Sequence, residues 1–326
     1  MKIKRFSTEK GHYLVLENLS GLALTLSDIG ASLYEVRFQS KCMNIAPEDP
    51  QAFETSLAYY GKTIGRIAGR VRNGRIDIAG KTCQMSTNEG RNAHHGGHSS
   101  FAFKLFSEQV EEKEEKTIVT YSYLSPKGEE DMPGNLLFQV IYEIPENAPS
   151  FRVLFKAQTD EDCLLHPILH PYFNLGEEDI MNHRLFLAAH SYYEMDEEMI
   201  PAKAVPCTPL LDFSEKKRIG DGAEDPAFLD HAPWGYDHFY VLDPHADPAA
   251  ILESKNFQME VRTDFPCLLI YADNFAKGVK LNNGLLEKKH AALAIECSEH
   301  PAGAKPNLLK KGETYQRYSE YTFTTK

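Results

Sequence analysis

The chain has 326 residues, of which 42% are hydrophobic and 25% charged, the composition of a soluble globular protein. Its formal net charge of -12, from 35 basic and 47 acidic residues, argues against nucleic acid and anionic membrane as partners. We see no signal peptide and no 18-residue apolar run, and the six cysteines form no CxxC pair, so we expect a cytoplasmic protein with reduced thiols.

Short segments with alternating or apolar character predict β-strands along the whole chain. In chain order they cover residues 13–17, 22–26, 33–38, 117–124, 137–144, 151–157, 185–189, 261–264, 267–271, 292–297 and 318–324. Residues 75–85 predict a hairpin that turns at Ala79 and Gly80. The charged run 111–116 predicts the solvated tip of another hairpin.

Other elements are few. Residues 50–61 predict one short helical turn, and residues 201–212 and 245–248 predict loops. The chain shows no sustained helical periodicity, no internal repeat and no Gly/Ser-rich or Pro-rich linker. Many short strands with turns between them favour an all-β protein, a large β-sandwich or barrel, and we expect residues 1–326 to form one domain.

The stretch 164–175 places His166 and His170 four residues apart in an apolar, aromatic run. Pro167 and Pro171 exclude a regular helix, so the run is expected to be extended, with both histidines on one side. A histidine in such a place can transfer protons near neutral pH. It can equally be a core histidine bonded to a backbone carbonyl, and this stretch alone favours that interpretation.

Four further stretches combine polar residues with glycine or aromatic residues. They are residues 65–74, which hold three arginines, residues 92–98, which hold three histidines, and residues 234–239 and 294–297. Each has an ordinary explanation: a solvated arginine loop, surface histidines or metal ligands, and Asp237 as a turn cap. Glu296 is harder to explain in this way, because a carboxylate inside an apolar strand must be paired or have a raised pKa if it faces inward.

Together, these stretches resemble the aldose 1-epimerase (galactose mutarotase) family over most of the chain. Residues 65–70 resemble the family's Gly-Arg-x-Ala-Asn-Arg, and residues 88–97 resemble Asn-x-Gly-x-Asn-x-x-His-Gly-Gly. Residues 125–136 resemble Ser-Pro-Asp-Gly-Glu-Glu-Gly-x-Pro-Gly-Asn-Leu, and residues 170–175 resemble His-x-Tyr-Phe-Asn-Leu. Residues 235–238 and 271–275 follow the same pattern, and Glu296 with Pro301 stands where the family has Leu-Glu-Thr-Gln-x-x-Pro.

The resemblance implies packed antiparallel sheets, with the site in a cleft on one of them. It implies interconversion of the α- and β-anomers of a free hexose such as galactose or glucose, without cofactor or metal. Glu296 would be the general base and His170 the general acid, while Arg70, His95 and Asp237 match positions that hold the sugar hydroxyls. The expected partner is a small sugar, and the expected assembly is a monomer or a homodimer.

Two further expectations concern the pocket. His170 must be protonated to act as an acid, and we expect neighbouring Asp or Glu residues to raise its pKa. Tyr172, Phe173 and Trp234 are expected to pack on the apolar face of a pyranose.

The sequence departs from the family pattern at four positions, where Gly69, His94, Leu169 and Ser298 replace the usual Asn, Leu, Asn and Gln. These changes affect hydroxyl recognition more than the acid–base pair.

Three alternatives remain from the sequence. The first is a carbohydrate-binding β-sandwich without catalysis. The second is a metal-dependent β-barrel enzyme, whose ligands would come from His94, His95, His98, His166 and His170. The third is an epimerase acting on a sugar phosphate, for which Arg66 and Arg72 are the local candidates for a phosphate pocket.

Overall fold

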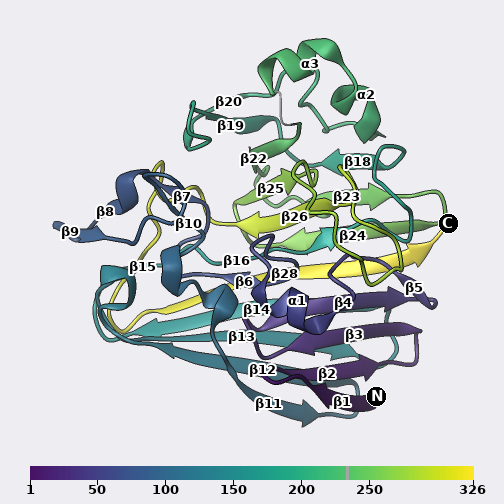
Figure 1. The fold of residues 1–326 in the computed structure, drawn as a ribbon, viewed down its shortest axis with the longest axis horizontal. Coiled ribbons are helices and arrows are strands. Elements are labelled where there is room, and N and C mark those ends of the chain that lie inside the picture. Colours follow the sequence, from purple (N-terminus) through teal and green to yellow (C-terminus); the bar gives the residue numbers. More distant parts are fainter. Residues whose placement is uncertain (233–234) are drawn as a thin grey trace.

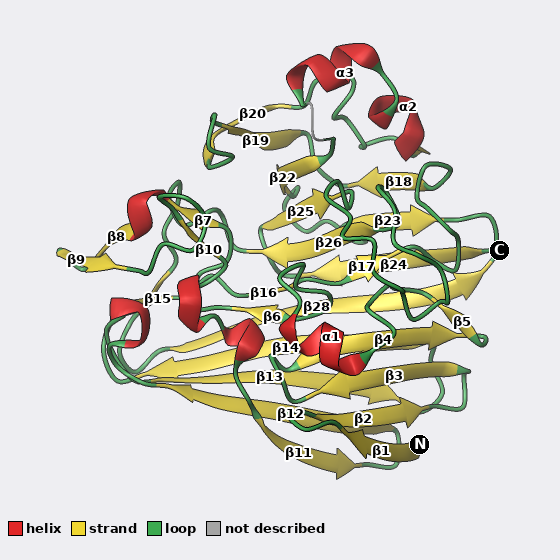
Figure 2. Ribbon diagram, in the orientation of Figure 1, coloured by secondary structure: helices red, strands yellow, loops and turns green. Residues whose placement is uncertain are grey.

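Alternation of buried and exposed side chains builds the longest strands of the protein, and helices are few and short (Figures 1 and 2). The structure, a computed structural model, describes residues 1–232 and 235–326. In β13 (Leu136–Pro145) every second side chain is buried, and the strand pairs antiparallel with β12 (Lys116–Ser125) on one side and β14 (Ser150–Thr159) on the other. Such a two-residue period places one face of a sheet against the core.

The largest sheet within the described residues has nine strands. Their order is β11 (Ser107–Glu112), β12, β13, β14, β28 (Thr314–Thr325), β24 (Phe257–Thr263), β23 (Ala250–Glu253), β18 (Arg184–Leu187) and β21 (Lys217–Arg218). The C-terminal strand β28 lies in the middle of this sheet, between β14 and β24, and joins its two halves (Figure 1).

Two smaller sheets pack on this large one. The first runs in the order β1 (Lys2–Ser7), β2 (His12–Glu17), β3 (Leu22–Ser27), β4 (Ser32–Phe38) and β5 (Lys41–Cys42). The second runs in the order β17 (Tyr172–Phe173), β26 (Leu293–Ser298), β25 (Cys267–Tyr271), β22 (Asp237–Val241), β19 (Ser191–Met195) and β20 (Pro201–Pro206). We refer to the second as the site sheet.

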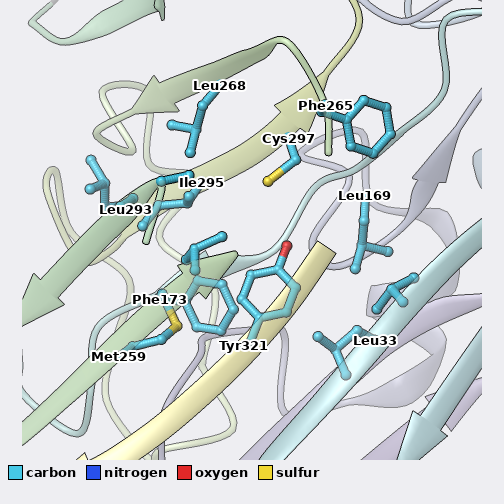
Figure 3. Close-up of a cluster of buried hydrophobic side chains, with 14 of the residues drawn as sticks. Leu33, Leu169, Phe173, Met259, Phe265, Leu268, Leu293, Ile295, Cys297 and Tyr321 are labelled. Atoms are coloured by element: carbon cyan, nitrogen blue, oxygen red, sulfur yellow. The ribbon is translucent and has the colours of Figure 1, made fainter. Parts of the chain in front are cut away.

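One continuous hydrophobic core joins the three sheets. It includes Leu24 of β3 and Val140 of β13, and it continues to Met259 of β24 and Ile295 of β26. Figure 3 shows the part of this core under the site sheet, where side chains from β17, β24, β26 and β28 lie together. The sheets therefore form the packed antiparallel arrangement that the sequence predicted.

Short pairs of strands and single helical turns complete the fold. The pairs are β7 (Arg70–Val71) with β10 (Ala93–His94), β6 (Thr63–Ile64) with β16 (Ile168–Leu169), β8 (Arg75–Ile78) with β9 (Lys81–Gln84), and β15 (Cys163–Leu164) with β27 (Leu308–Leu309). The helices are α1 (Pro50–Thr55), α2 (Ile219–Ala223) and α3 (Pro226–His231), with 3-10 turns at Arg72–Gly74, Gly97–Ser99, Phe101–Phe103 and Glu129–Asp131.

Most predicted elements are confirmed, among them the helical turn after Pro50 and the hairpin at Ala79 and Gly80. The prediction of a loop over residues 201–212 is wrong in its first half, because Pro201–Pro206 forms the edge strand β20. The two prolines stand at its first and last positions, and an edge strand tolerates proline because one side of it needs no ladder hydrogen bonds. None of the described helices has the length and hydrophobicity that a bilayer-spanning segment needs.

Candidate active site

The alternation of strand β26 divides its side chains between the core and a cavity. Leu293, Ile295 and Cys297 point into the hydrophobic core, as Figure 3 shows. Glu296 and Ser298 therefore lie on the opposite face of the site sheet, where they line a cavity of about 700 Å³. Such a volume is typical of a small-molecule site.

All five predicted site residues line this one cavity: Arg70, His95, His170, Asp237 and Glu296. Glu296 and Asp237 come from β26 and β22 of the site sheet. The other three come from segments that lie against it. Arg70 is on β7, and His95 directly follows β10, the strand with which β7 pairs.

Both backbone groups of His170, its N–H and its carbonyl, form hydrogen bonds with the segment at Gly61 and Lys62. The Gly61 N–H donates to the His170 carbonyl at 2.8 Å, and the His170 N–H donates to the Lys62 carbonyl at 3.0 Å. Its ring stacks on Tyr172, with ring centroids 5.0 Å apart and an interplanar angle of 22°. These contacts fix the imidazole at the edge of the site sheet.

His170 and Glu296 meet inside the cavity wall, where Nε2 of the imidazole lies 3.1 Å from Oε1 of the carboxyl group. Both side chains are buried, at 7% and 3% exposure. Among the described residues, Nδ1 of His170 and Oε1 of Glu296 still lack a well-formed hydrogen bond. Buried polar atoms without a partner are unusual, and in a cavity they are available to a bound ligand.

Burial moves the two pKa values in opposite directions. It lowers the pKa of His170 to about 3, and it raises the pKa of Glu296 well above its ordinary value, with Asp237 raising it further. The expectation that a neighbouring acid raises the pKa of His170 is therefore wrong. Loss of hydration on burial is the largest cause of the shift, because it disfavours the charged imidazolium.

His95 is held in one tautomer by the backbone of Gly69. The Gly69 N–H donates to Nδ1 of His95 at 3.2 Å, and the His95 N–H donates to the Gly69 carbonyl at 3.0 Å. Burial lowers the pKa of His95 well below its ordinary value, so the ring is neutral. Since Nδ1 accepts a hydrogen bond, the ring proton is on Nε2, which is then a donor.

Arg70 and Asp237 add two further ionisable side chains to the cavity. Glu89 accepts two hydrogen bonds from Arg70, from Nε at 2.5 Å and from Nη2 at 2.9 Å. Burial raises the pKa of Asp237 to about 6, although the charge of Arg70 lowers it. The cavity thus combines the close contact between His170 and Glu296 with donors and acceptors suited to hydroxyl groups.

Comparison with known proteins identifies the family of the chain. The family model described as Aldose 1-epimerase matches residues 12–322. The chain belongs to the aldose 1-epimerase family. Named relatives of this family are isomerases, so the predictions of family, enzyme class and mutarotase-like β-fold are confirmed.

Individual relatives cover almost the whole chain. The aldose 1-epimerase of Escherichia coli strain K12 is 29% identical over 334 aligned positions, which span 95% of this chain and 94% of the relative. The galactose mutarotase of Mus musculus is 28% identical over 279 positions, spanning 82% and 79%. The crystal structure of galactose 1-epimerase from Lactobacillus acidophilus NCFM superimposes with a TM-score of 0.91 at 27% identity, covering 99% and 98%.

Two residues of the predicted stretches, Arg66 and His166, make contacts that hold the structure together. Arg66 is buried and donates to Ser125 Oγ at 2.8 Å, to the Pro133 carbonyl at 2.8 Å and to the Gly134 carbonyl at 3.0 Å. It therefore fastens the motif at residues 125–136 to the motif at residues 65–70. His166 lines the cavity, but both of its ring nitrogens bond to backbone groups, as the interpretation of a core histidine expects.

Phe173 and Tyr172, two aromatic residues predicted to contact a sugar, differ in their positions. Phe173 is fully buried in the core and does not line the cavity, so its predicted contact with a sugar is wrong. Its neighbour Tyr172 does line the cavity, because adjacent strand residues point to opposite faces. Trp234 lies outside the described residues.

No three described His, Cys, Asp or Glu side chains converge as metal ligands, and the absence of a metal stays a prediction.

Sequence reasoning missed two acidic residues of the cavity, Glu89 and Asp273. Both lie within stretches that carry family motifs, so position alone could have drawn attention to them. Asp273 is 4% exposed, and its Oδ2 has no partner among the described residues. Burial, together with the charge of Glu287, raises its pKa to about 8.

Proposed function

We propose that the protein accelerates interconversion of the α- and β-anomers of a free hexose, by acid–base opening and closing of the sugar ring. The contact of 3.1 Å between His170 and Glu296 in the cavity wall is the observation that supports this most. Ring opening requires one proton to leave the anomeric hydroxyl and one to reach the ring oxygen. Two adjacent acid–base groups meet that requirement without a cofactor.

In the proposed mechanism, Glu296 removes the proton from the anomeric hydroxyl and His170 donates a proton to the ring oxygen. The C1–O5 bond breaks, and the products are an aldehyde at C1 and a hydroxyl at C5. Rotation about C1–C2 presents the other face of the aldehyde. The ring then closes as the two residues exchange roles, so that every proton returns to its starting group.

The pKa shifts of the pair support this chemistry. Burial lowers the pKa of His170 and raises that of Glu296, so it favours the neutral imidazole together with the protonated carboxyl group, a pair that carries one proton. The reaction needs a Glu296 carboxylate and a protonated His170. This ionised pair carries the same single proton as the neutral pair, and the two forms differ only in which residue holds that proton. A sugar hydroxyl that hydrogen-bonds to the carboxylate favours the ionised form, with the proton on His170.

Three residues are proposed to hold the sugar hydroxyls. Arg70 donates from its guanidinium, His95 donates from Nε2, and Asp237 accepts through its carboxylate. Tyr172 offers an aromatic wall beside His170, suited to the apolar face of a pyranose.

A phosphorylated substrate has less support. Arg66 is occupied by backbone and serine oxygens, and Arg72 is paired with Asp196 and Glu198. Neither of the two predicted phosphate-binding arginines is available for a phosphate group.

Polarimetry or saturation-transfer NMR on freshly dissolved α-D-glucose and α-D-galactose tests the proposal. With EDTA present, the protein is expected to speed the approach to anomeric equilibrium on at least one of the two sugars. Equilibration at the spontaneous rate on both would contradict the proposal.

A further inference from the structure

Glu89 forms part of the cavity wall and pairs with Arg70, one of the residues proposed to hold the sugar. Its two carboxylate oxygens accept from Nε and Nη2 of Arg70 at 2.5 and 2.9 Å. This fork-to-fork geometry is the strong form of an arginine–carboxylate pair. The Arg70 side chain is 18% exposed and that of Glu89 is 42% exposed, so the pair faces the cavity and remains reachable from it.

A tight turn holds the backbone of Glu89. The Glu89 N–H donates to the Asn92 carbonyl at 3.1 Å, and the Asn92 N–H donates to the Glu89 carbonyl at 2.9 Å. The neighbouring Asn88 side chain bonds to both the N–H and the carbonyl of His94. The turn therefore holds the Glu89 backbone beside the cavity, and the Arg70 guanidinium holds its carboxylate.

The pair changes what Arg70 offers to a ligand. With Nε and Nη2 occupied, Nη1 is the guanidinium nitrogen to which no described residue supplies an acceptor. The positive charge of Arg70 is balanced by the carboxylate beside it. What remains is a hydrogen-bond donor with little net charge, which suits a hydroxyl oxygen better than an anion.

The rest of the cavity does not restore a positive charge. Its other acidic groups are Asp237, Asp273 and Glu296, and its other cation among the described residues is Lys277, which is exposed. The neighbouring His94 lies with Nδ1 3.6 Å from Glu89, and burial lowers its pKa to about 4, so it is neutral at pH 7.

We propose that Glu89 is a specificity-determining residue: by pairing with Arg70 it makes the cavity accept uncharged aldoses and reject aldoses that carry a carboxylate, such as hexuronic acids. This inference rests on the proposed function and adds the charge class of its substrate. Without Glu89, the unbalanced guanidinium would bind a substrate carboxylate as arginines commonly do.

Glu89→Gln tests this with nearly unchanged shape. Saturation-transfer NMR would give kcat/KM for D-glucose against D-glucuronate and for D-galactose against D-galacturonate. In the variant, kcat/KM for the uronate relative to its neutral partner is expected to rise about tenfold, mainly through a lower KM. Glu320→Gln is the matched control, since Glu320 pairs with Arg152 through Nε and Nη2 outside the cavity, and it should leave the ratio unchanged.

A ratio within twofold of wild type in Glu89→Gln would overturn the inference, while wild-type acceleration of the neutral sugars would still uphold the proposed function. If the variant loses turnover on every sugar, calorimetry on the variant and on wild type gives dissociation constants for glucose and glucuronate. The affinity for glucuronate relative to glucose then tests the inference in place of the kcat/KM ratio. Wild type that accelerates neither neutral sugar would overturn the proposed function, and this inference with it.

Discussion

Tyr172 and Phe173 are neighbours on strand β17, yet they serve opposite faces of the site sheet. The Tyr172 ring stacks on His170 in the cavity wall, and its hydroxyl donates to the Ala58 carbonyl at 3.0 Å. The Phe173 ring lies in the core, with its centroid 5.4 Å from that of Tyr321 (Figure 3). One dipeptide thus links the site to the core.

Phe173→Ala is expected to lower the free energy of unfolding by about 3–5 kcal/mol, because it removes a fully buried ring and leaves a cavity. Tyr172→Phe, which keeps the ring and removes one hydrogen bond, is expected to cost about 1 kcal/mol. Urea unfolding of the two variants and wild type measures both effects. Equal costs for the two would show that the division of faces is not as described.

Arg70→Lys is expected to raise KM for a neutral hexose about tenfold and to leave kcat within about threefold. A lysine keeps the charge but cannot form the planar fork by which Arg70 contacts Glu89, so the donor to the sugar is no longer fixed. Steady-state kinetics by saturation-transfer NMR separates the two constants. A large loss of kcat at unchanged KM would instead place Arg70 in the chemical step.

The raised pKa of Asp237 predicts a pH dependence. Burial moves this pKa to about 6, so the carboxyl group is mainly neutral at pH 5 and mainly ionised at pH 7. An ionised carboxylate is the better acceptor for a sugar hydroxyl, and kcat/KM should therefore rise with pH, with a midpoint near 6. In Asp237→Asn the value should be lower and the step absent. A step that persists in this variant would assign it to another group.

Asp273 is expected to make stability fall as pH rises. Its folded pKa of about 8, raised mainly by burial, lies above the unfolded value near 4. The folded state thus keeps a proton that the unfolded chain releases, and this contribution to stability is complete below about pH 4 and lost as pH approaches 8.

Asp273→Asn should therefore be more stable than wild type by about 2–4 kcal/mol at pH 8 and nearly equal to it at pH 4. Urea midpoints at the two pH values measure the difference. A variant that is less stable than wild type at pH 8 would show that the ionised carboxylate has a partner in the folded protein.

Much of the fold follows from the sequence, because alternation is a local property. The strand around Val140 shows it over its whole length, the strand around Ile295 is predicted from its apolar run, and both form where predicted. Strand β20 was missed because Pro201 and Pro206 are typical of loops, and only the sheet shows that they stand at the ends of an edge strand. The sequence also does not show on which face of the sheet the Phe173 side chain lies, because a strand of two residues is too short to show an alternating pattern.

The five residues predicted for the site line one cavity, and their roles there stay predictions, whereas one of the pKa shifts was predicted wrongly. Glu296 attracts attention because it is a carboxylate in an apolar strand, and the family motifs indicate His170. The pKa of His170 was predicted in the wrong direction, because burial depends on packing of distant segments. The contact between Arg70 and Glu89 joins residues 19 positions apart through paired strands, and no spacing rule predicts it.

The most direct test of the central claim compares anomer equilibration by wild type, Glu296→Gln and His170→Asn in the presence of EDTA. Glu320→Gln and His190→Asn are controls, because each removes an acid or an imidazole that lies outside the cavity. The account predicts acceleration by wild type and both controls, and a loss of about 100-fold or more in each site variant. Acceleration that survives in Glu296→Gln or in His170→Asn would contradict it.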